Sequence, residues 1–177
     1  MEIKMNILEP LFLNPQTGFL MREIAKTTKI NHSTIRKYLN YYVREHILIQ
    51  KNGKPYPLFT VNMESKKYLN LKLYFNLEQL RKSNIIEHLE KFFEYPPIVL
   101  FGSFSKGTDD EQSDIDICVI TDIQREFNTK VYEKTLRRPV SIHQYSEKNW
   151  NRAKDKNKGL VNNIANGITL AGQLEVL

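Results

Sequence analysis

Two aspartates spaced two residues apart, in a stretch that otherwise has the pattern of a buried strand, have the clearest capacity for chemistry in this sequence. Asp114 and Asp116 stand in the run SDIDICVI. Because side chains alternate along a strand, both carboxylates project from one face, and Ile115 and Ile117 project from the other. Two carboxylates held this close repel each other unless a cation lies between them. The pair therefore predicts a divalent metal site.

A Gly-Ser pair precedes the aspartates. Gly102 and Ser103 follow the apolar run PIVLF. A glycine at the end of a strand lets the backbone turn sharply and approach a ligand closely. We expect a helix to begin just after this turn, where free amides suit phosphate oxygens. A phosphate-binding turn opposite a carboxylate pair is suited to nucleotidyl transfer, in which Mg²⁺ bridges a triphosphate.

The neighbouring elements follow from the apolar pattern. PIVLF and DICVI are short apolar runs typical of central strands covered on both faces, REFNTKVYEKTLRR predicts a helix, and PVSIHQYS predicts a third strand. Two helices are predicted between Glu64 and Phe93, separated near Ser83-Asn84, and the leucine stripe of the first could pack on either domain or in a dimer. Asp109, Asp110 and Glu111 are expected to be solvated loop acids.

The order Gly102-Ser103, three residues, Gly107, five residues, Ser113-Asp114-Ile115-Asp116 resembles the signature of the DNA polymerase β-type nucleotidyltransferase superfamily, in particular its minimal archaeal and bacterial members. The resemblance implies that Gly102 and Ser103 bind the triphosphate of ATP or another NTP. It implies that Asp114 and Asp116 are catalytic and hold Mg²⁺. It adds Lys106, where the family often has arginine, with Gly107 and Ser113, to the nucleotide-binding set. The tail GLVNNIANGITLAGQLEVL resembles the C-terminal helix and closing strand of minimal members.

The third strand departs from the family. Active members usually carry a third carboxylate on this strand, beside the first two, whereas here it offers Ser141 and His143. The nearest acid, Glu147, lies beyond the strand end. Two readings stay open: His143 replaces the missing base, or the domain binds nucleotide without transferring it.

The positive charge gathers near the N-terminus. The chain has a net charge of +6, and between Arg22 and Lys54 eight basic residues stand against two acidic ones. A basic cluster of this kind is typical of proteins that bind polyanions. The same region predicts helices in MNILEPLFL, FLMREIAKTTKI and NHSTIRKYLNYYVREH, with Asn31 as an N-cap, and a hairpin in ILIQKNGKPYPLFTV with a two-residue Asn52-Gly53 turn.

Helix, helix-turn-helix and hairpin in this order resemble the winged helix-turn-helix family of DNA-binding domains. The resemblance implies that the third helix enters the major groove with the residues His32, Ser33, Thr34, Arg36 and Lys37. It implies that Lys51 and Lys54 on the wing meet phosphates. The alternative from the residues alone is a small helical module that only packs against proteins.

The sequence therefore predicts an α+β protein: a winged helix-turn-helix at residues 1–62, a connector helix at 63–83 and a minimal nucleotidyltransferase domain at 84–177, whose small mixed β-sheet is flanked by helices. With no long apolar segment and a single cysteine, Cys118, we expect a soluble protein of the reducing cytoplasm without a membrane partner. Expected partners are duplex DNA, a cognate protein acceptor such as a toxin, and a second copy in a homodimer. The expected activity transfers a nucleoside monophosphate from an NTP to a protein or small-molecule hydroxyl. The alternative is a DNA-binding regulator whose second domain only binds nucleotide or mediates assembly.

Overall fold

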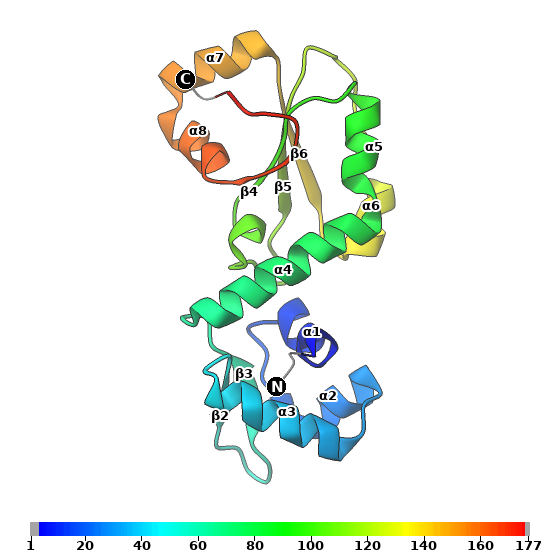
Figure 1. The fold of residues 1–177 in the computed structure, drawn as a ribbon, viewed down its shortest axis with the longest axis vertical. Coiled ribbons are helices and arrows are strands. Elements are labelled where there is room, and N and C mark those ends of the chain that lie inside the picture. Colours follow the sequence, from blue (N-terminus) through cyan, green and yellow to red (C-terminus); the bar gives the residue numbers. More distant parts are fainter. Residues whose placement is uncertain (1–3, 176–177) are drawn as a thin grey trace. The chain divides into compact units, whose positions relative to one another are not determined.

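The computed structural model describes residues 4–175 and divides into two compact units, the first ending at Phe75 and the second beginning at Asn76 (Figure 1). The division falls inside helix α4, Lys66–Ser83, where the sequence predicts the first of two helices. The second, α5, spans Ile85–Phe92, and Asn84 between them has a φ of +57°. The predicted break near Ser83-Asn84 is therefore confirmed.

The first unit contains three helices and a three-stranded antiparallel sheet of order β1-β3-β2 among its described residues. Its elements are α1 (Met5–Leu13), β1 (Phe19–Leu20), α2 (Met21–Thr28), α3 (His32–Arg44), β2 (Leu48–Lys51) and β3 (Leu58–Val61). The predicted N-cap of α3 is present, because the Asn31 carboxamide oxygen accepts the Thr34 amide at 2.8 Å.

The core of the first unit forms where the apolar stripes of the three helices meet. Ile24 of α2 and Ile35 and Leu39 of α3 are fully buried, as their spacing predicts. Tyr68 and Phe75, from the N-terminal part of α4, complete this core. The helical framework of this region thus agrees with the sequence prediction.

The hairpin β2–β3 is present, but its predicted two-residue turn is wrong. Lys51 pairs with Leu58, so residues 52–57 form the loop. Pro55 and Pro57 lack an amide hydrogen and cannot extend the strand ladder toward Asn52-Gly53. Gly53 serves a close approach instead, because a Cβ atom there would lie 2.4 Å from the carbonyl oxygen of Tyr56.

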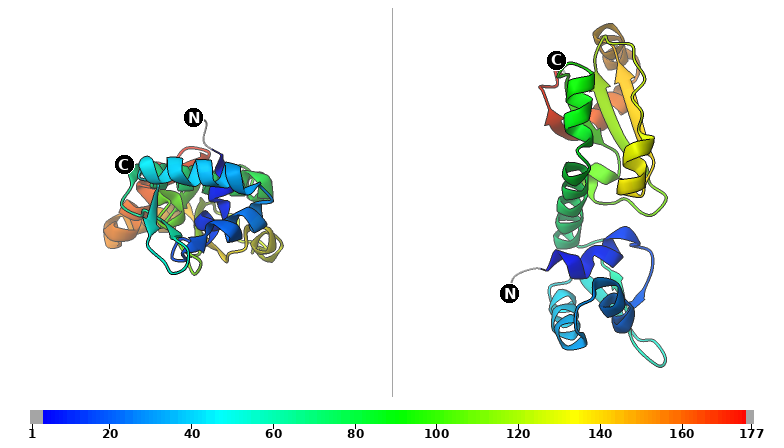
Figure 2. Two further views of the ribbon diagram at one scale, coloured as in Figure 1. Left: turned by 90° about the horizontal axis from the view of Figure 1, so that it is seen from below. Right: turned by 90° about the vertical axis from the view of Figure 1, so that its right-hand side faces the viewer.

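The second unit is built on a mixed four-stranded sheet of order β6-β5-β4-β7, in which β5 and β6 are parallel and the other pairs antiparallel. After α5 its elements are β4 (Ile98–Phe101), the 3₁₀ turn η1 (Phe104–Lys106), β5 (Ile115–Ile120), α6 (Lys130–Leu136), β6 (Val140–Tyr145), α7 (Glu147–Lys156), α8 (Lys158–Ala165) and β7 (Ile168–Ala171). Figure 2 shows the same elements in two further orientations.

Helices cover this sheet on both faces. Leu89 of α5 and Leu136 of α6 pack on the face that carries Ile117, whereas Trp150 of α7 and Ile164 of α8 pack on the face that carries Cys118. Figure 1 shows α5 and α6 on one side of the strands and α7 and α8 on the other. The continuous apolar runs of β4 and β5 follow from this double cover. Burial raises the pKa of Cys118 to about 12, so it remains a neutral thiol.

Two helices differ from prediction. Helix α6 begins only at Lys130, because the Asn128 side chain accepts the Lys130 amide at 3.1 Å, a local bond that competes with helix formation. Helix α7 was not predicted, although the Ser146 hydroxyl caps it by accepting the Asn149 amide at 3.2 Å. Within residues 4–175, no helix combines the length and apolar character needed to cross a bilayer.

Candidate nucleotide-binding site

The turn after β4 is shaped around one carboxylate. Phe101, the last residue of β4, pairs directly with Asp116 of β5. The next residue, Gly102, has a φ of +74°, and a Cβ atom there would lie 2.5 Å from Asp116 Oδ2. Both the conformation and the space therefore require glycine at this position. The glycine lets the backbone of the Gly-Ser turn lie directly against the Asp116 carboxylate.

A single 3₁₀ turn follows the Gly-Ser pair. The predicted helix start is therefore only one turn long: η1 begins after Ser103 and ends at Gly107, whose φ is +67°. The first amides of such a turn have no acceptor within it, so they remain suited to a phosphate. Among the described residues, the Ser103 hydroxyl has no hydrogen-bond partner. Lys106 lies at the surface, with its Nζ 3.3 Å from Asn163 Oδ1 of α8.

The aspartate pair lies at the start of the interior strand β5, at the end of the sheet beside this turn. Asp114 is exposed just before β5, and the Asp116 side chain is 28% exposed within it. Because residues alternate along β5, Asp116 shares the face of Cys118, which α7 and α8 cover. The Ser141 hydroxyl donates to Asp114 Oδ2 over a long 3.4 Å. Because β5 begins only at Ile115, the projection of the Asp114 carboxylate from the same face as Asp116 stays a prediction.

A histidine stands next to the pair on the adjacent strand. His143 Nε2 lies 3.1 Å from Asp116 Oδ1, and its ring meets the edge of Phe101 at 5.0 Å between centroids. The parallel pairing of β5 and β6 produces this contact, because it sets Asp116 opposite Ser141 and places His143 two residues further along the same face. If Nε2 carries the proton and donates to Asp116, Nδ1 is left as an acceptor.

The two carboxylates at this end of the sheet are suitable ligands for a magnesium ion. Across the described part of the chain, no group of three or more His, Cys, Asp or Glu side chains is arranged to hold a metal ion. Mg²⁺ does not require such a group, because proteins bind it through one or two carboxylates together with substrate phosphates. Oxygen atoms of Asp114 and Asp116 are suitable ligands, whereas the imidazole of His143 is of the type that suits zinc or copper.

Ser113 closes the loop that leads into β5. Its hydroxyl donates to Asp110 Oδ1 at 2.9 Å and accepts the Asp110 amide at 3.0 Å. The hydrogen bond from Ser113 lowers the pKa of Asp110, and the Gln112 amide adds to this effect. The Ser113 hydroxyl therefore fixes the loop before Asp114, and its predicted contact with phosphate stays a prediction.

A buried polar network that was not predicted from the sequence supports the Gly-Ser turn. Asp109, expected to be solvated, is fully buried. Arg138 Nη2 lies 3.2 Å from Asp109 Oδ2, and Asn76 Nδ2 donates to Asp109 Oδ1 at 2.7 Å and to the Phe104 carbonyl at 2.9 Å. The expectation for Asp109 is wrong because a buried guanidinium and an amide replace its water. Glu111 is exposed, as predicted.

The predicted DNA-contacting residues lie in the first unit. Helix α3 exposes four of them around a shallow depression that Asn40 completes: His32, Ser33, Arg36 and Lys37. Thr34 is half-buried, with its amide bonded to Asn31. Lys51 at the end of β2 and Lys54 in the hairpin loop are exposed. Their contacts with DNA stay predictions.

The comparisons with known proteins concern the second unit. Residues 83–167 match the family model described as Polymerase beta, Nucleotidyltransferase. This segment includes the Gly-Ser turn, the aspartate pair and His143. No curated protein and no solved structure matches the chain. The family match supports placing residues 83–167 in the polymerase β nucleotidyltransferase superfamily.

Proposed function

We propose that this protein is a DNA-associated nucleotidyltransferase that transfers a nucleoside monophosphate from an NTP to a hydroxyl of a protein or small molecule. One observation carries the proposal: the Gly102 backbone packs against Asp116, and His143 contacts the same carboxylate. One end of the sheet thus carries the proposed triphosphate-binding turn, the carboxylate pair and a candidate base.

The transfer forms one bond and breaks another. The acceptor hydroxyl oxygen attacks the α-phosphorus, and the bond from that phosphorus to the oxygen of the leaving pyrophosphate breaks. Pyrophosphate departs with the electron pair, and the hydroxyl proton passes to a base. His143 supplies this base at Nδ1, while Asp116 accepts its Nε2–H and orients the ring, an arrangement known from other histidine bases.

Asp114 and Asp116 would hold Mg²⁺, which when bound neutralises charge on the phosphates. The chain's own groups do the rest of the positioning. The amides that follow Gly102 meet phosphate oxygens, as does the Ser103 hydroxyl, which is not engaged with another described residue. Lys106, exposed at the end of the same turn, adds a positive charge for the triphosphate.

A second function has a specific observation in its favour. Strand β6 presents Ser141 and His143 beside the aspartates and no third carboxylate. If His143 only holds Asp116 in place, the domain binds nucleotide without transferring it. The protein would then be a DNA-binding regulator whose second unit senses nucleotide or mediates assembly.

The first unit supports DNA association through its charge and its exposed helix. We infer a winged helix-turn-helix, with α3 in the major groove and the β2–β3 hairpin as the wing. Support comes from the order of the elements and from Arg36 and Lys37, whose side chains are exposed on α3. The proposed partner for transfer is a cognate protein that brings its own hydroxyl to the second unit.

Transfer of radiolabel separates the two functions. ATP labelled at the α-phosphate is incubated with the full chain and a native extract, because only the α-phosphorus moves to the acceptor. We expect label on a protein partner with the wild type and none with Asp116→Asn. Asp122→Asn, which removes an exposed acid outside the site, should label as the wild type does. Absence of label where ATP binding is demonstrated would favour the regulator.

A further inference from the structure

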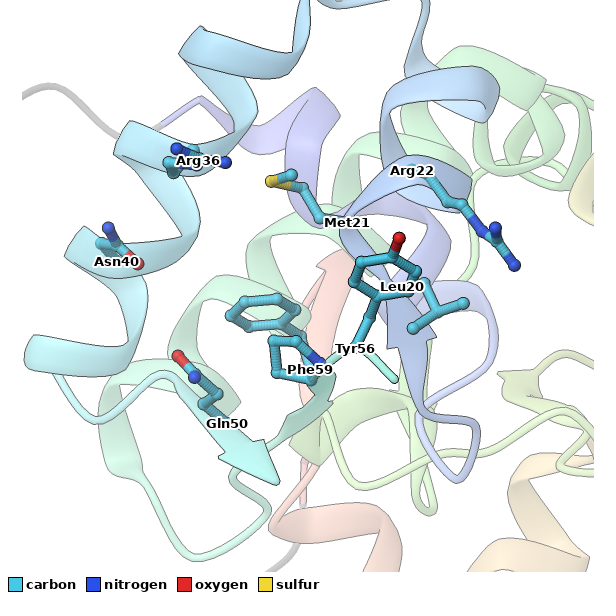
Figure 3. A pocket seen from close by; sticks show the side chains of 9 residues that line it. Leu20, Met21, Arg22, Arg36, Asn40, Gln50, Tyr56 and Phe59 are labelled. Carbon is cyan, nitrogen blue, oxygen red and sulfur yellow. The ribbon is translucent and has the colours of Figure 1, made fainter. Parts of the chain in front are cut away.

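A cavity in the first unit lies between α2, α3 and the β2–β3 hairpin, and it shares Arg36 and Asn40 with the depression on α3. Its volume is about 460 Å³, within the range of about 300–1,000 Å³ found for small-molecule sites. Figure 3 shows Met21 on α2, Arg36 and Asn40 on α3 and Phe59 on β3, with Arg22 of α2 on the opposite side of the view from Arg36.

The wall of this cavity is apolar and aromatic. Leu20, Met21, Pro57 and Phe59 contribute hydrocarbon surface, and the Tyr56 ring lies at its edge (Figure 3). Tyr56 is 57% exposed, so its ring is accessible to a ligand. Burying such an apolar wall under a flat hydrophobic ligand contributes favourable binding free energy, whereas a bare phosphate makes no such contribution.

Two guanidinium groups give the cavity its charge. Arg22 and Arg36 line it, and none of the described residues around it is acidic. In the part of the chain that the structure describes, neither arginine has a salt bridge or hydrogen bond. The guanidinium carbon of Arg22 lies 6.0 Å from the centroid of the Tyr56 ring. Exposed, unpaired guanidinium groups beside an apolar wall are suited to bind a carboxylate through paired N–H donors.

We propose that this cavity binds a small aromatic anion, a planar apolar body that carries a carboxylate. The ring system lies on Met21 and Phe59, and the carboxylate pairs with Arg36, while Arg22 adds a second positive charge to the lining. Asn40 and Gln50, also in the lining, offer amide donors and acceptors for further polar groups of the ligand. The available volume admits one or two fused rings.

The site has a consequence for DNA binding, which rests on the proposed DNA-binding function. Arg36 and Asn40 line both this cavity and the depression on the exposed side of α3. A ligand carboxylate that engages Arg36 removes that cation from phosphate contact. The ligand therefore weakens DNA binding, and by reciprocity DNA weakens ligand binding.

The test uses sodium 2-naphthoate as probe and its neutral analogue 2-naphthalenemethanol as control, titrated into the full chain by calorimetry. Naphthoate should bind at least about tenfold more tightly than the alcohol, because a charge-assisted hydrogen bond is worth a factor of that order. Arg36→Gln should weaken naphthoate binding by about tenfold or more, and Arg22→Gln should weaken it less, because it removes only a nearby charge. Both side chains are exposed, so both variants should fold.

Lys26→Gln is the matched control, because it removes an exposed cation from α2 that does not line the cavity. It should bind naphthoate as the wild type does. No binding at millimolar naphthoate, equal affinity for the alcohol, or equal affinity in Arg36→Gln and Lys26→Gln would each overturn the proposal.

Competition with a labelled DNA duplex tests the consequence separately. Naphthoate should displace the duplex from the wild type and from Lys26→Gln. Simultaneous binding of naphthoate and the duplex would contradict the proposed competition. If the wild type binds naphthoate and no DNA, the proposed DNA-binding function is wrong and the proposed ligand site is retained.

Discussion

At the residue scale, the backbone at Gly102 and the carboxylate of Asp116 occupy a space that no side chain at residue 102 could enter. The left-handed conformation of Gly102 costs an L-residue about 1–2 kcal/mol. The contact of 2.5 Å adds to this cost, because an alanine methyl would push the carboxylate away from the turn. The two halves of the proposed nucleotide site are therefore linked by one glycine.

Gly102→Ala should lower stability by about 1–3 kcal/mol and abolish Mg²⁺-dependent ATP binding, since the displaced carboxylate no longer faces the turn. Chemical denaturation and calorimetry measure the two effects. Gly159→Ala is the matched control: a Cβ atom there meets nothing within 4 Å, and alanine favours the helix α8. Equal ATP affinity in Gly102→Ala and wild type would contradict the assigned role.

His143→Asn should slow transfer by about 100-fold or more, because asparagine cannot accept a proton, while ATP affinity changes little. His143→Asp places a carboxylate on the strand where active relatives carry one, and it should retain more activity than His143→Asn. Rates at saturating ATP, compared with affinities from calorimetry, separate the two quantities. If His143→Asn transfers label as fast as the wild type, His143 is not the base.

The sequence predicted the β5 strand and the strand face of Asp116 from alternation, which is a local rule, whereas Asp114 lies just before the strand begins at Ile115. It could not place His143, since the contact with Asp116 depends on the parallel register of β5 and β6. It failed for Asp109, because the run DDEQSD has the composition of a solvated loop and the partners Asn76 and Arg138 are distant in sequence.

At the scale of elements, the loop between β4 and β5 is fixed at both ends. Ser113 and Asp110 close it before β5, and Asp109 anchors it to Arg138 and Asn76. Asn76 belongs to α4 and holds the carbonyl of Phe104 in η1. The position of the Gly-Ser turn therefore depends on buried polar groups from three separate parts of the chain: helix α4, the β4–β5 loop and the segment between α6 and β6.

Arg138→Met should destabilise the second unit by about 3 kcal/mol, because it removes the guanidinium from the buried Asp109 carboxylate. Arg137→Met is the matched control, since Arg137 is the exposed neighbour, and it should change stability by less than about 0.5 kcal/mol. Urea denaturation of both variants measures the difference. Equal stabilities would show that the Asp109–Arg138 pair does not support the fold.

Elements with strong periodicity were predicted well, and those defined by local polar bonds were not. Helix α3 and strands β4 and β5 follow from the spacing or continuity of their apolar residues. Helix α7 buries mainly Trp150, so its sequence carries almost no apolar stripe, and the hairpin turn was misjudged because two prolines outweigh the Asn-Gly signal.

At the scale of the whole molecule, the residues proposed to bind DNA and the residues proposed to bind nucleotide belong to different units of the chain. The exposed cations of α3 and the hairpin belong to the first unit, and the aspartate pair belongs to the second. Substitutions in one unit should therefore leave the binding proposed for the other unit, to DNA or to nucleotide, unchanged. This separation makes each proposed function open to an independent test.

Arg36→Gln with Lys37→Gln should weaken binding to duplex DNA and lower the salt slope by about two, one for each lost phosphate contact. Lys26→Gln with Arg44→Gln removes the same charge from outside the depression on α3 and should have a smaller effect. Fluorescence anisotropy over a range of salt concentrations measures the slopes. No binding by the wild type at low salt would contradict the assignment of the first unit.

The central claim is that the Gly-Ser turn and the aspartate pair form one site for a nucleoside triphosphate and Mg²⁺. Calorimetric titration of ATP into the full chain, with and without Mg²⁺, tests it most directly. The wild type should bind ATP only with Mg²⁺, and Asp114→Asn with Asp116→Asn should abolish binding because amides cannot balance the charge of the cation. Asp122→Asn with Asp155→Asn, an equal loss of exposed charge elsewhere in the second unit, should bind as the wild type does. Equal affinity in the wild type and the Asp114–Asp116 double variant would contradict the claim.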